Sequence, residues 1–340
     1  MEKRDLDIIL DCAVNWLMYK DKTVLVTGAT GRLGRYIVDS LIEVDLRYDL
    51  NMTILCLARS SKKLRSVFGD ELEFPNVNIM CQDMNEPIVY DGTIDFIFHT
   101  AGPAAPVDFK EEPAEMLWCH VNGTRNILEC ARTHVTKKVF YVSTVEIYGE
   151  WTGEREIIES DMGILQHLNS RAGYPEAKRL CETMLAVYEK EYGVKYCGVR
   201  LSHTLGPGIL LDDGRAFAEF INQSLKGKDI ILTSDGSAMR TYTYVADAMN
   251  AIFLIMERGE GTFYNVSTDE NLVSVRDLAE LIAGMSPSGK TRVLLEGVAS
   301  QLPYLPFKLP IMDTSRIRSL GWKPRVGLRD MFKWIMESFV

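Results

Sequence analysis

Two hydrophobic patterns alternate along the first 200 residues of the chain. Short apolar runs rich in β-branched residues predict buried strands, and longer stretches with apolar residues every three or four positions predict helices. Strands that alternate with helices are typical of a parallel sheet covered on both faces. The sequence therefore predicts an α/β fold with a doubly wound parallel sheet. The expected strands are 22–27, 52–57, 77–81, 96–99 and 138–143, and the expected helices are 36–44, 112–132 and 175–192.

The two ends of the chain differ from this pattern. Three acidic residues interrupt the apolar positions of residues 1–20, which argues against a targeting segment and favours an N-terminal amphipathic helix. From about residue 201 turns become dense, so we expect a nucleotide-binding domain at 21–200 and a smaller substrate-binding lobe mainly at 201–340, with some segments returning to the sheet. The acidic residues are Asp5, Asp7 and Asp11, and the helically spaced apolar residues are Leu6, Ile9, Leu10, Ala13, Trp16 and Leu17.

Composition narrows the possible partners. Apolar residues make up 46% and charged residues 25% of the chain, as is ordinary for a globular protein. The formal net charge of −9 argues against nucleic acid and anionic membranes, because both require clustered Lys and Arg. The longest apolar runs fall short of the roughly 20 residues that span a bilayer. The seven cysteines show no metal-ligand spacing, so we expect free thiols, no metal site and a cytoplasmic location.

A glycine-rich turn follows the first expected strand and opens the first expected helix. Gly28, Gly31 and Gly34 are spaced G-x-x-G-x-x-G. Small residues let the backbone approach a pyrophosphate, and the N–H groups and dipole of the helix N-terminus favour its negative charge. The context of strand, turn and helix predicts a Rossmann-type domain that binds a dinucleotide.

The residues after the second and third strands bear on the choice of dinucleotide. An acid at the end of the second strand binds the ribose 2′-hydroxyl of NAD, whereas an Arg accommodates the 2′-phosphate of NADP. Arg59 stands there, so NADP is favoured over NAD, unless Arg59 stacks on the adenine or faces solvent. Asp83 follows the third strand and either accepts a hydrogen bond from the adenine amino group or caps a turn.

Tyr174 and Lys178 are four residues apart at the start of an expected helix, so both side chains project from one face. A phenol with a pKa near 10 is a poor base at neutral pH. A neighbouring ammonium group and an oxidised nicotinamide both favour the phenolate. Tyr174 is therefore a candidate proton acceptor in hydride transfer, although such a pair also occurs on ordinary helices.

Several motifs appear in order along the chain, and together they are more specific than any one of them. After the T-G-x-x-G-x-x-G turn come H-T-A-G at 99–102, V-N-G-T at 121–124, V-S-T-V-E-I-Y-G at 142–149 and Y-P-E-A-K at 174–178. The set resembles the extended short-chain dehydrogenase/reductase family, in its branch of nucleotide-sugar epimerases, dehydratases and decarboxylases. The resemblance covers nearly the whole chain after residue 20.

The resemblance implies roles for the matching residues. Thr144 would bind the sugar hydroxyl that is oxidised, Tyr174 would take its proton, and Lys178 would hold the nicotinamide ribose and lower the pKa of the tyrosine. His203 stands where many relatives carry Asn, which leaves its contact with the diphosphate open. The implied cofactor contacts are Gly28, Thr30, Gly31, Arg32, Leu33, Gly34, Arg59, Asp83, Met84, Thr100, Ala101, Gly102, Asn122, Tyr174 and Lys178, and the implied substrate contacts are Pro103, Thr144, Glu146, His203, Arg215 and Arg240.

The planar guanidinium groups of Arg215 and Arg240 suit phosphate or carboxylate oxygens, unless these residues form exposed salt bridges. The resemblance also implies that the branch shares a first step, in which a hydride leaves carbon 4 of the sugar and a 4-keto intermediate forms. It further implies a homodimer built through the two long helices.

The neighbours of the tyrosine would decide the later steps. Dehydratases of the branch use adjacent Asp and Glu where this chain has Val145 and Glu146, and Val cannot protonate a leaving hydroxyl. UDP-glucuronate decarboxylases resemble the chain more closely, with a Glu at this position and an Arg at the position of Arg240. We therefore expect a UDP-glucuronate decarboxylase-like enzyme. The alternatives are a 4-epimerase, then a 4,6-dehydratase or ketoreductase, and remotely an inactive NAD(P)-sensing protein.

Overall fold

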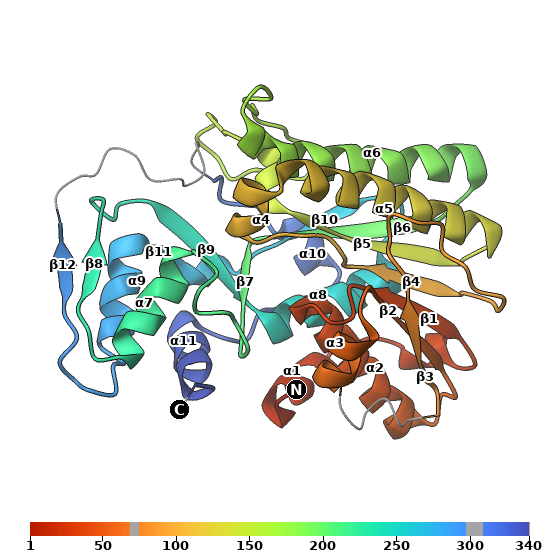
Figure 1. Ribbon diagram of the computed structural model, residues 1–340, viewed down its shortest axis with the longest axis horizontal. Coiled ribbons are helices and arrows are strands. Elements are labelled where there is room, and N and C mark those ends of the chain that lie inside the picture. Colours follow the sequence, from red (N-terminus) through yellow and green to blue (C-terminus); the bar gives the residue numbers. More distant parts are fainter. Residues whose placement is uncertain (69–74, 297–308, 340) are drawn as a thin grey trace.

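The computed structural model describes residues 1–68, 75–296 and 309–339. Its centre is a sheet of seven parallel strands in the order β10-β6-β5-β4-β1-β2-β3 (Figure 1). The strands are β1 (Thr23–Thr27), β2 (Thr53–Ala58), β3 (Val77–Cys81), β4 (Phe96–His99), β5 (Lys138–Thr144), β6 (Tyr196–Leu201) and β10 (Phe263–Val266). Because β1 lies between β2 and β4, the chain winds outward from β1 in both directions. The predicted α/β fold with a doubly wound parallel sheet is confirmed.

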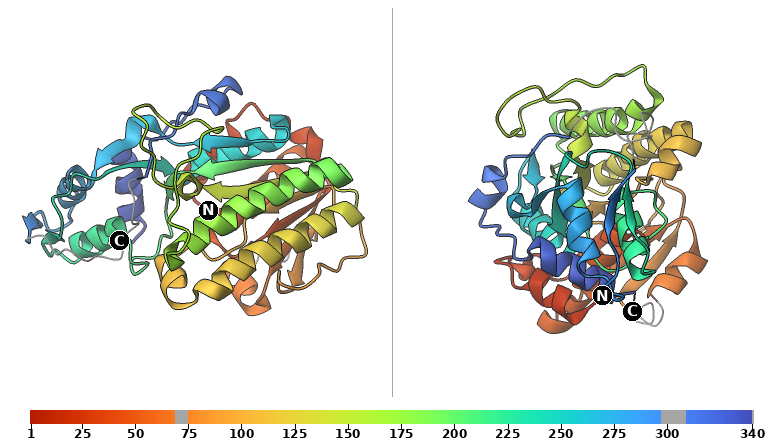
Figure 2. Two further views of the ribbon diagram at one scale, coloured as in Figure 1. Left: turned by 90° about the horizontal axis from the view of Figure 1, so that it is seen from above. Right: turned by 90° about the vertical axis from the view of Figure 1, so that its left-hand side faces the viewer.

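In the part of the chain that the structure describes, five helices cover the two faces of this sheet. They are α2 (Arg32–Tyr48), α3 (Ser61–Phe68), α5 (Pro113–Thr133), α6 (Gly173–Tyr192) and α8 (Val245–Arg258). Successive strand residues point to opposite faces, so Val24 and Val26 of β1 pack in the core with α2 and α8, while Leu25 packs in the core with α5 and α6. Figure 1 shows these two helical layers on either side of the sheet, and α5 and α6 lie side by side in Figure 2.

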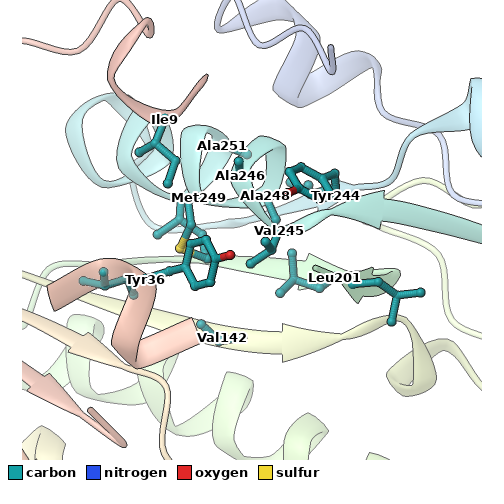
Figure 3. Packing of buried hydrophobic residues seen from close by; sticks show 14 of the residues in the cluster. Ile9, Tyr36, Val142, Leu201, Tyr244, Val245, Ala246, Ala248, Met249 and Ala251 are labelled. Carbon is teal, nitrogen blue, oxygen red and sulfur yellow. The ribbon is translucent and has the colours of Figure 1, made fainter. Parts of the chain in front are cut away.

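The N-terminal segment is shorter as a helix than its apolar spacing predicts. Helix α1 (Lys3–Leu10) ends at Leu10, and a separate 3₁₀-helix, η1, covers Trp16–Tyr19. The predicted helix over 1–20 is therefore wrong beyond Leu10, and Leu17 is 62% exposed. Helix α1 packs on α8, and Figure 3 shows α8 between Ile9 on one side and Val142 and Leu201 of the sheet on the other.

The smaller lobe lies at one end of the sheet, at the left of Figure 1. Strand β9 pairs antiparallel with β11 and parallel with β7, and β8 pairs with β12. The chain leaves this lobe to form α8 and β10, and β10 pairs with β6 at the edge of the central sheet. The elements of the lobe are β7 (His203–Leu205), α7 (Ala216–Leu225), β8 (Ile230–Leu232), β9 (Met239–Tyr244), β11 (Leu272–Ser274), α9 (Val275–Ala283), β12 (Val293–Leu295) and α11 (Leu328–Glu337).

Candidate active site

The glycine turn between β1 and α2 has the geometry that its sequence requires. Gly28 has a φ of +66°, and a Cβ there would lie 2.8 Å from the Cα of Ala101. A Cβ on Gly34 would overlap the carbonyl oxygen of Gly28, while Gly31 donates its N–H to that oxygen at 2.8 Å. The turn therefore packs against both the start of α2 and the segment after β4. This close packing leaves the N-terminus of α2 next to the ends of the parallel strands, where dinucleotides bind in such folds.

The segment after β4 is fixed to the glycine turn by a buried polar relay. The imidazole of His99 contacts the Thr27 hydroxyl at 2.9 Å and the Thr124 hydroxyl at 3.1 Å. Burial lowers the pKa of His99 to about 3, so the ring is neutral. Thr100 donates its hydroxyl to the Thr27 carbonyl at 2.7 Å, and the N–H of Ala101 donates to the Thr27 hydroxyl at 3.3 Å. The relay places the ends of β1 and β4 against the middle of α5.

The predicted adenine-side residues follow β2 and β3. Arg59 is exposed at the end of β2. The Asp83 carboxylate accepts the N–H of Asn85 at 2.9 Å, which is the turn-capping contact that the sequence left as an alternative. Met84 is buried against α5, where its side chain would meet a Cβ on Gly123. Three other predicted cofactor contacts, Thr30, Leu33 and Asn122, are partly buried.

Arg32 points toward the smaller lobe. Its guanidinium donates to the carbonyl of Thr204 in β7 at 3.3 Å. Burial, and then the nearby charge of Arg215, lower the pKa of Arg32. The side chain of Arg32 thus lies between the glycine turn and the lobe.

Tyr174 and Lys178 lie on the first turns of α6, and both are buried. Burial and the charge of Glu146 raise the pKa of Tyr174, against the opposing effects of a hydrogen bond to Thr144 and of Arg215 and Arg171. Lys178 donates to the Val142 carbonyl at 2.8 Å, and burial lowers its pKa to about 8. Burial therefore disfavours the charged forms of both the phenol and the ammonium group, although a pKa of about 8 still leaves Lys178 mostly charged at neutral pH.

The ring of Tyr174 is held by aromatic neighbours. The ring of Phe109, in α4 (Pro106–Glu111), lies 4.8 Å from it, and the imidazole of His120 lies 5.4 Å from it in an edge-on arrangement. His120 Nε2 is in turn 2.9 Å from the carbonyl of Pro103, and Gly102 has no side chain, which makes room for the imidazole. These contacts fix the phenol next to the segment after β4.

Glu146 follows β5 in the 3₁₀-helix η3 (Val145–Tyr148) and forms an ion pair with Arg171. The Arg171 Nη2 to Glu146 Oε2 distance is 2.7 Å, and the Glu146 side chain is 14% exposed. Burial raises the pKa of Glu146, while Arg171 and, next, Arg215 oppose this shift. The site therefore holds a carboxyl group whose pKa is raised by burial and whose charge raises the pKa of Tyr174.

The remaining predicted substrate residues come from the lobe. Arg215 donates to the Ala104 carbonyl at 2.8 Å and lies 3.7 Å from the Asp213 carboxylate. Arg240 donates to its neighbouring Met239 carbonyl at 2.8 Å, and burial with the charge of Arg240 lowers the pKa of His203 to about 3. Arg240, His203 and Val145 line one small cavity between the sheet and the lobe. The charge of Arg215 acts on the pKa values of Glu146 and Tyr174 and also on that of His203, which lines the cavity with Arg240.

Sequence reasoning missed three residues of this site. Arg171, Phe109 and His120 contact Glu146 or Tyr174, although none belongs to a motif used for the prediction. Arg171 stands three residues before Tyr174 in S-R-A-G-Y, so its proximity was the one signal available. The approach of Phe109 and His120 depends on how α4 and α5 pack against α6, which their local sequence does not specify.

The comparisons with known proteins agree with this geometry. The family model described as "NAD dependent epimerase/dehydratase family" matches residues 24–267. The chain belongs to this family. The match starts at the second residue of β1 and ends just after β10, so it includes all seven strands of the central sheet.

The chain is also similar to curated proteins and to solved structures. It is 27% identical to UDP-glucuronic acid decarboxylase 3 of Arabidopsis thaliana, over 93% of the chain and 88% of the relative. It is 28% identical to UDP-glucuronic acid decarboxylase 1 of Xenopus tropicalis, over 93% of the chain and 72% of the relative. The fold is similar to that of a UDP-glucose 4-epimerase from Thermotoga maritima, with a TM-score of 0.77, 24% identity and coverage of 93% and 98% of the two chains. Among the described residues, no helix is both long and apolar enough to cross a membrane.

Proposed function

We propose that this protein is a nicotinamide-dependent decarboxylase of UDP-glucuronate that acts through a 4-keto intermediate. The observation that carries the proposal is the partly buried carboxyl group of Glu146, which pairs with Arg171 and whose charge raises the pKa of Tyr174. The similarity to curated UDP-glucuronic acid decarboxylases supports the same substrate. A simple 4-epimerase requires no such extra carboxyl group, and Val145, which is 5% exposed, offers no acid for a dehydration.

The residues of the cofactor site fit a dinucleotide. A Cβ at Gly28 would clash with Ala101, and a Cβ at Gly34 would clash with the Gly28 carbonyl, so the turn requires glycine at both positions. The N-terminus of α2 favours the negative charge of a pyrophosphate. When bound, the nicotinamide would accept a hydride from carbon 4 and later return it. The ammonium group of Lys178, which donates a hydrogen bond to the Val142 carbonyl, would contact the nicotinamide ribose and stabilise the phenolate of Tyr174.

The chain's own residues would divide the proton transfers. Thr144 would orient the 4-hydroxyl, and Tyr174 would take its proton as the carbon is oxidised. The product of this oxidation is a β-keto acid. The bond between carbon 5 and the carboxylate then breaks, carbon dioxide leaves, and the electron pair of that bond forms an enolate across carbons 4 and 5. Glu146 is the proposed proton donor to carbon 5, because burial raises its pKa and it lies beside Tyr174.

The decisive experiment follows carbon dioxide and the sugar product. Purified enzyme is incubated with UDP-glucuronate labelled at carbon 6, with NAD or NADP added, and the nucleotide sugar is identified by mass and NMR. Label release with a pentose or keto-pentose product supports the proposal. Retention of the label with inversion at carbon 4 would replace it with the epimerase alternative.

The choice between NAD and NADP is a second part of the proposal. The exposed Arg59 at the end of β2, where an acid would bind the 2′-hydroxyl of NAD, favours NADP. Calorimetric titration of each dinucleotide tests this choice. An Arg59→Ala variant should weaken the binding of NADP and leave that of NAD unchanged.

We further propose a homodimer in a reducing, cytoplasmic compartment. Trp118 of α5 and Leu180 and Val187 of α6 are 54%, 47% and 48% exposed on the outer face of their helices. A second copy that pairs through these helices would cover them. All seven cysteines are unpaired, which suits a reducing compartment. Analytical ultracentrifugation and localisation of a tagged protein test the two statements.

A further inference from the structure

Arg171 is a charged group at the site to which the proposed reaction assigns no contact with the substrate. It lies in the 3₁₀-helix η4 (Ser170–Ala172), directly before α6. Its Nη2 binds Glu146, and its guanidinium stacks 4.3 Å from the ring centre of Phe109. Because Phe109 also packs against Tyr174, the guanidinium, the ring and the phenol form one packed unit.

The second terminal nitrogen of this guanidinium has no partner. Nη1 of Arg171 is buried and makes no hydrogen bond to any described residue. Nearly all buried donors in folded proteins are satisfied, by protein or by a bound molecule. Because stacking on Phe109 and the bond to Glu146 fix the plane of the guanidinium, the free nitrogen is a preorganised donor.

The charge of Arg171 acts on the reacting end of the site. Arg171 and Arg215 are the two guanidinium groups that lower the pKa of both Tyr174 and Glu146. Arg240, in contrast, lines the neighbouring cavity. A sugar that places its carbon 4 at Tyr174 would therefore bring the substituent on its carbon 5 close to Arg171 or Arg215.

We propose that Arg171 determines specificity for acidic sugars: it keeps Nη2 on Glu146 and donates Nη1 to the substrate carboxylate. This inference rests on the proposed function for the identity of the substrate class. The guanidinium would then bridge the protonated carboxyl group of Glu146 and the carboxylate of the substrate, and Arg215 would add positive charge near that carboxylate. A neutral sugar with a hydroxymethyl group at this position would gain much less from the same donor.

The test compares the binding of UDP-glucuronate and UDP-glucose by calorimetry, in a Tyr174→Phe background that prevents turnover. Arg171→Gln should weaken the binding of UDP-glucuronate by about 10- to 100-fold, since it removes a charge-assisted hydrogen bond, and that of UDP-glucose by less than about threefold. Arg171→Lys should restore part of the preference. Arg155→Gln is the matched control, because Arg155 is 56% exposed and pairs with Asp161 within its own loop.

The outcomes separate this inference from the proposed reaction. An equal loss for both nucleotide sugars, no loss for either, or a parent protein without preference for UDP-glucuronate would overturn the role of Arg171. Carbon dioxide release by the wild type together with an unchanged preference in Arg171→Gln would refute the inference and leave the decarboxylase standing. An Arg171-dependent preference without carbon dioxide release would do the reverse. Thermal melting of each variant in the same background confirms that it is folded.

Discussion

Replacing Asp5 by alanine should destabilise the protein strongly, although Asp5 lies outside the segment that the family model matches. Its side chain is fully buried, and its two oxygens accept the hydroxyls of Tyr36 at 2.7 Å and Tyr244 at 2.6 Å. Tyr36 lies on α2 and Tyr244 at the end of β9, so one carboxylate on α1 joins the cofactor helix to the lobe.

The magnitude follows from these contacts. A hydrogen bond to a charged group contributes about 1.5–3 kcal/mol, so two of them amount to roughly 3–6 kcal/mol. The alanine variant also leaves two tyrosine hydroxyls without a partner, while relief from burying a carboxylate offsets part of the loss. We expect a net loss of about 3–5 kcal/mol for Asp5→Ala. Asp5→Asn, which keeps the shape and one acceptor oxygen, should lose roughly half as much.

Thermal and urea unfolding of the full chain measure the effect. Asp7→Ala is the matched control, because Asp7 is exposed on the same helix and makes no side-chain hydrogen bond within the described residues. The Asp5→Ala melting temperature should fall by about 5–10 °C, and that of Asp7→Ala by about 1 °C or less. A double-mutant cycle with Tyr36→Phe should give a coupling energy above about 1 kcal/mol. Equal shifts for the two aspartates, or additive effects in the cycle, would refute the reasoning.

Three further predictions concern the site. Gly34→Ala should weaken dinucleotide binding more than about tenfold, because the added Cβ would overlap the Gly28 carbonyl oxygen. Gly327→Ala is the control, since the added Cβ there meets open space and should not weaken binding. Calorimetric titration of the dinucleotide measures both affinities. Tyr174→Phe and Lys178→Met should each lower kcat by at least about 100-fold, checked by steady-state assays alongside retained substrate binding. Because the pKa of His99 is about 3 when folded and about 6.5 when unfolded, its contribution to stability is complete above pH 6.5 and is lost as the pH falls toward 3, by roughly 1.4 kcal/mol per pH unit. His99→Gln should reduce this slope in melting curves between pH 7 and 5, and an unchanged slope would assign it to other groups.

The sequence by itself predicted the fold class, five of the seven strands of the central sheet and the order of the motifs, but not β6, β10 or the order of the strands. The strands predicted at 77–81 and 96–99 have the bounds of β3 and β4, because short β-branched and aromatic runs are local signals. The spacing of Tyr174 and Lys178 placed them on one helical face for the same reason. The predicted ends of helices were less accurate, because the local apolar pattern identifies a helix without fixing where it begins and ends. Helix α2 covers Arg32–Tyr48 and exceeds the predicted 36–44 at both ends.

Only the tertiary structure decided which distant groups share an environment. In the sequence, Asp5 was a charge that interrupts an apolar run. In the structure, the packing of α1 places its carboxylate where it accepts hydrogen bonds from Tyr36 of α2 and Tyr244 of β9. Likewise, Arg171 meets Glu146 because the chain between β5 and α6 returns to the end of β5. The physical reason is that helix and strand periodicities depend on neighbours three or four positions apart, whereas burial and ion pairing depend on how whole elements pack.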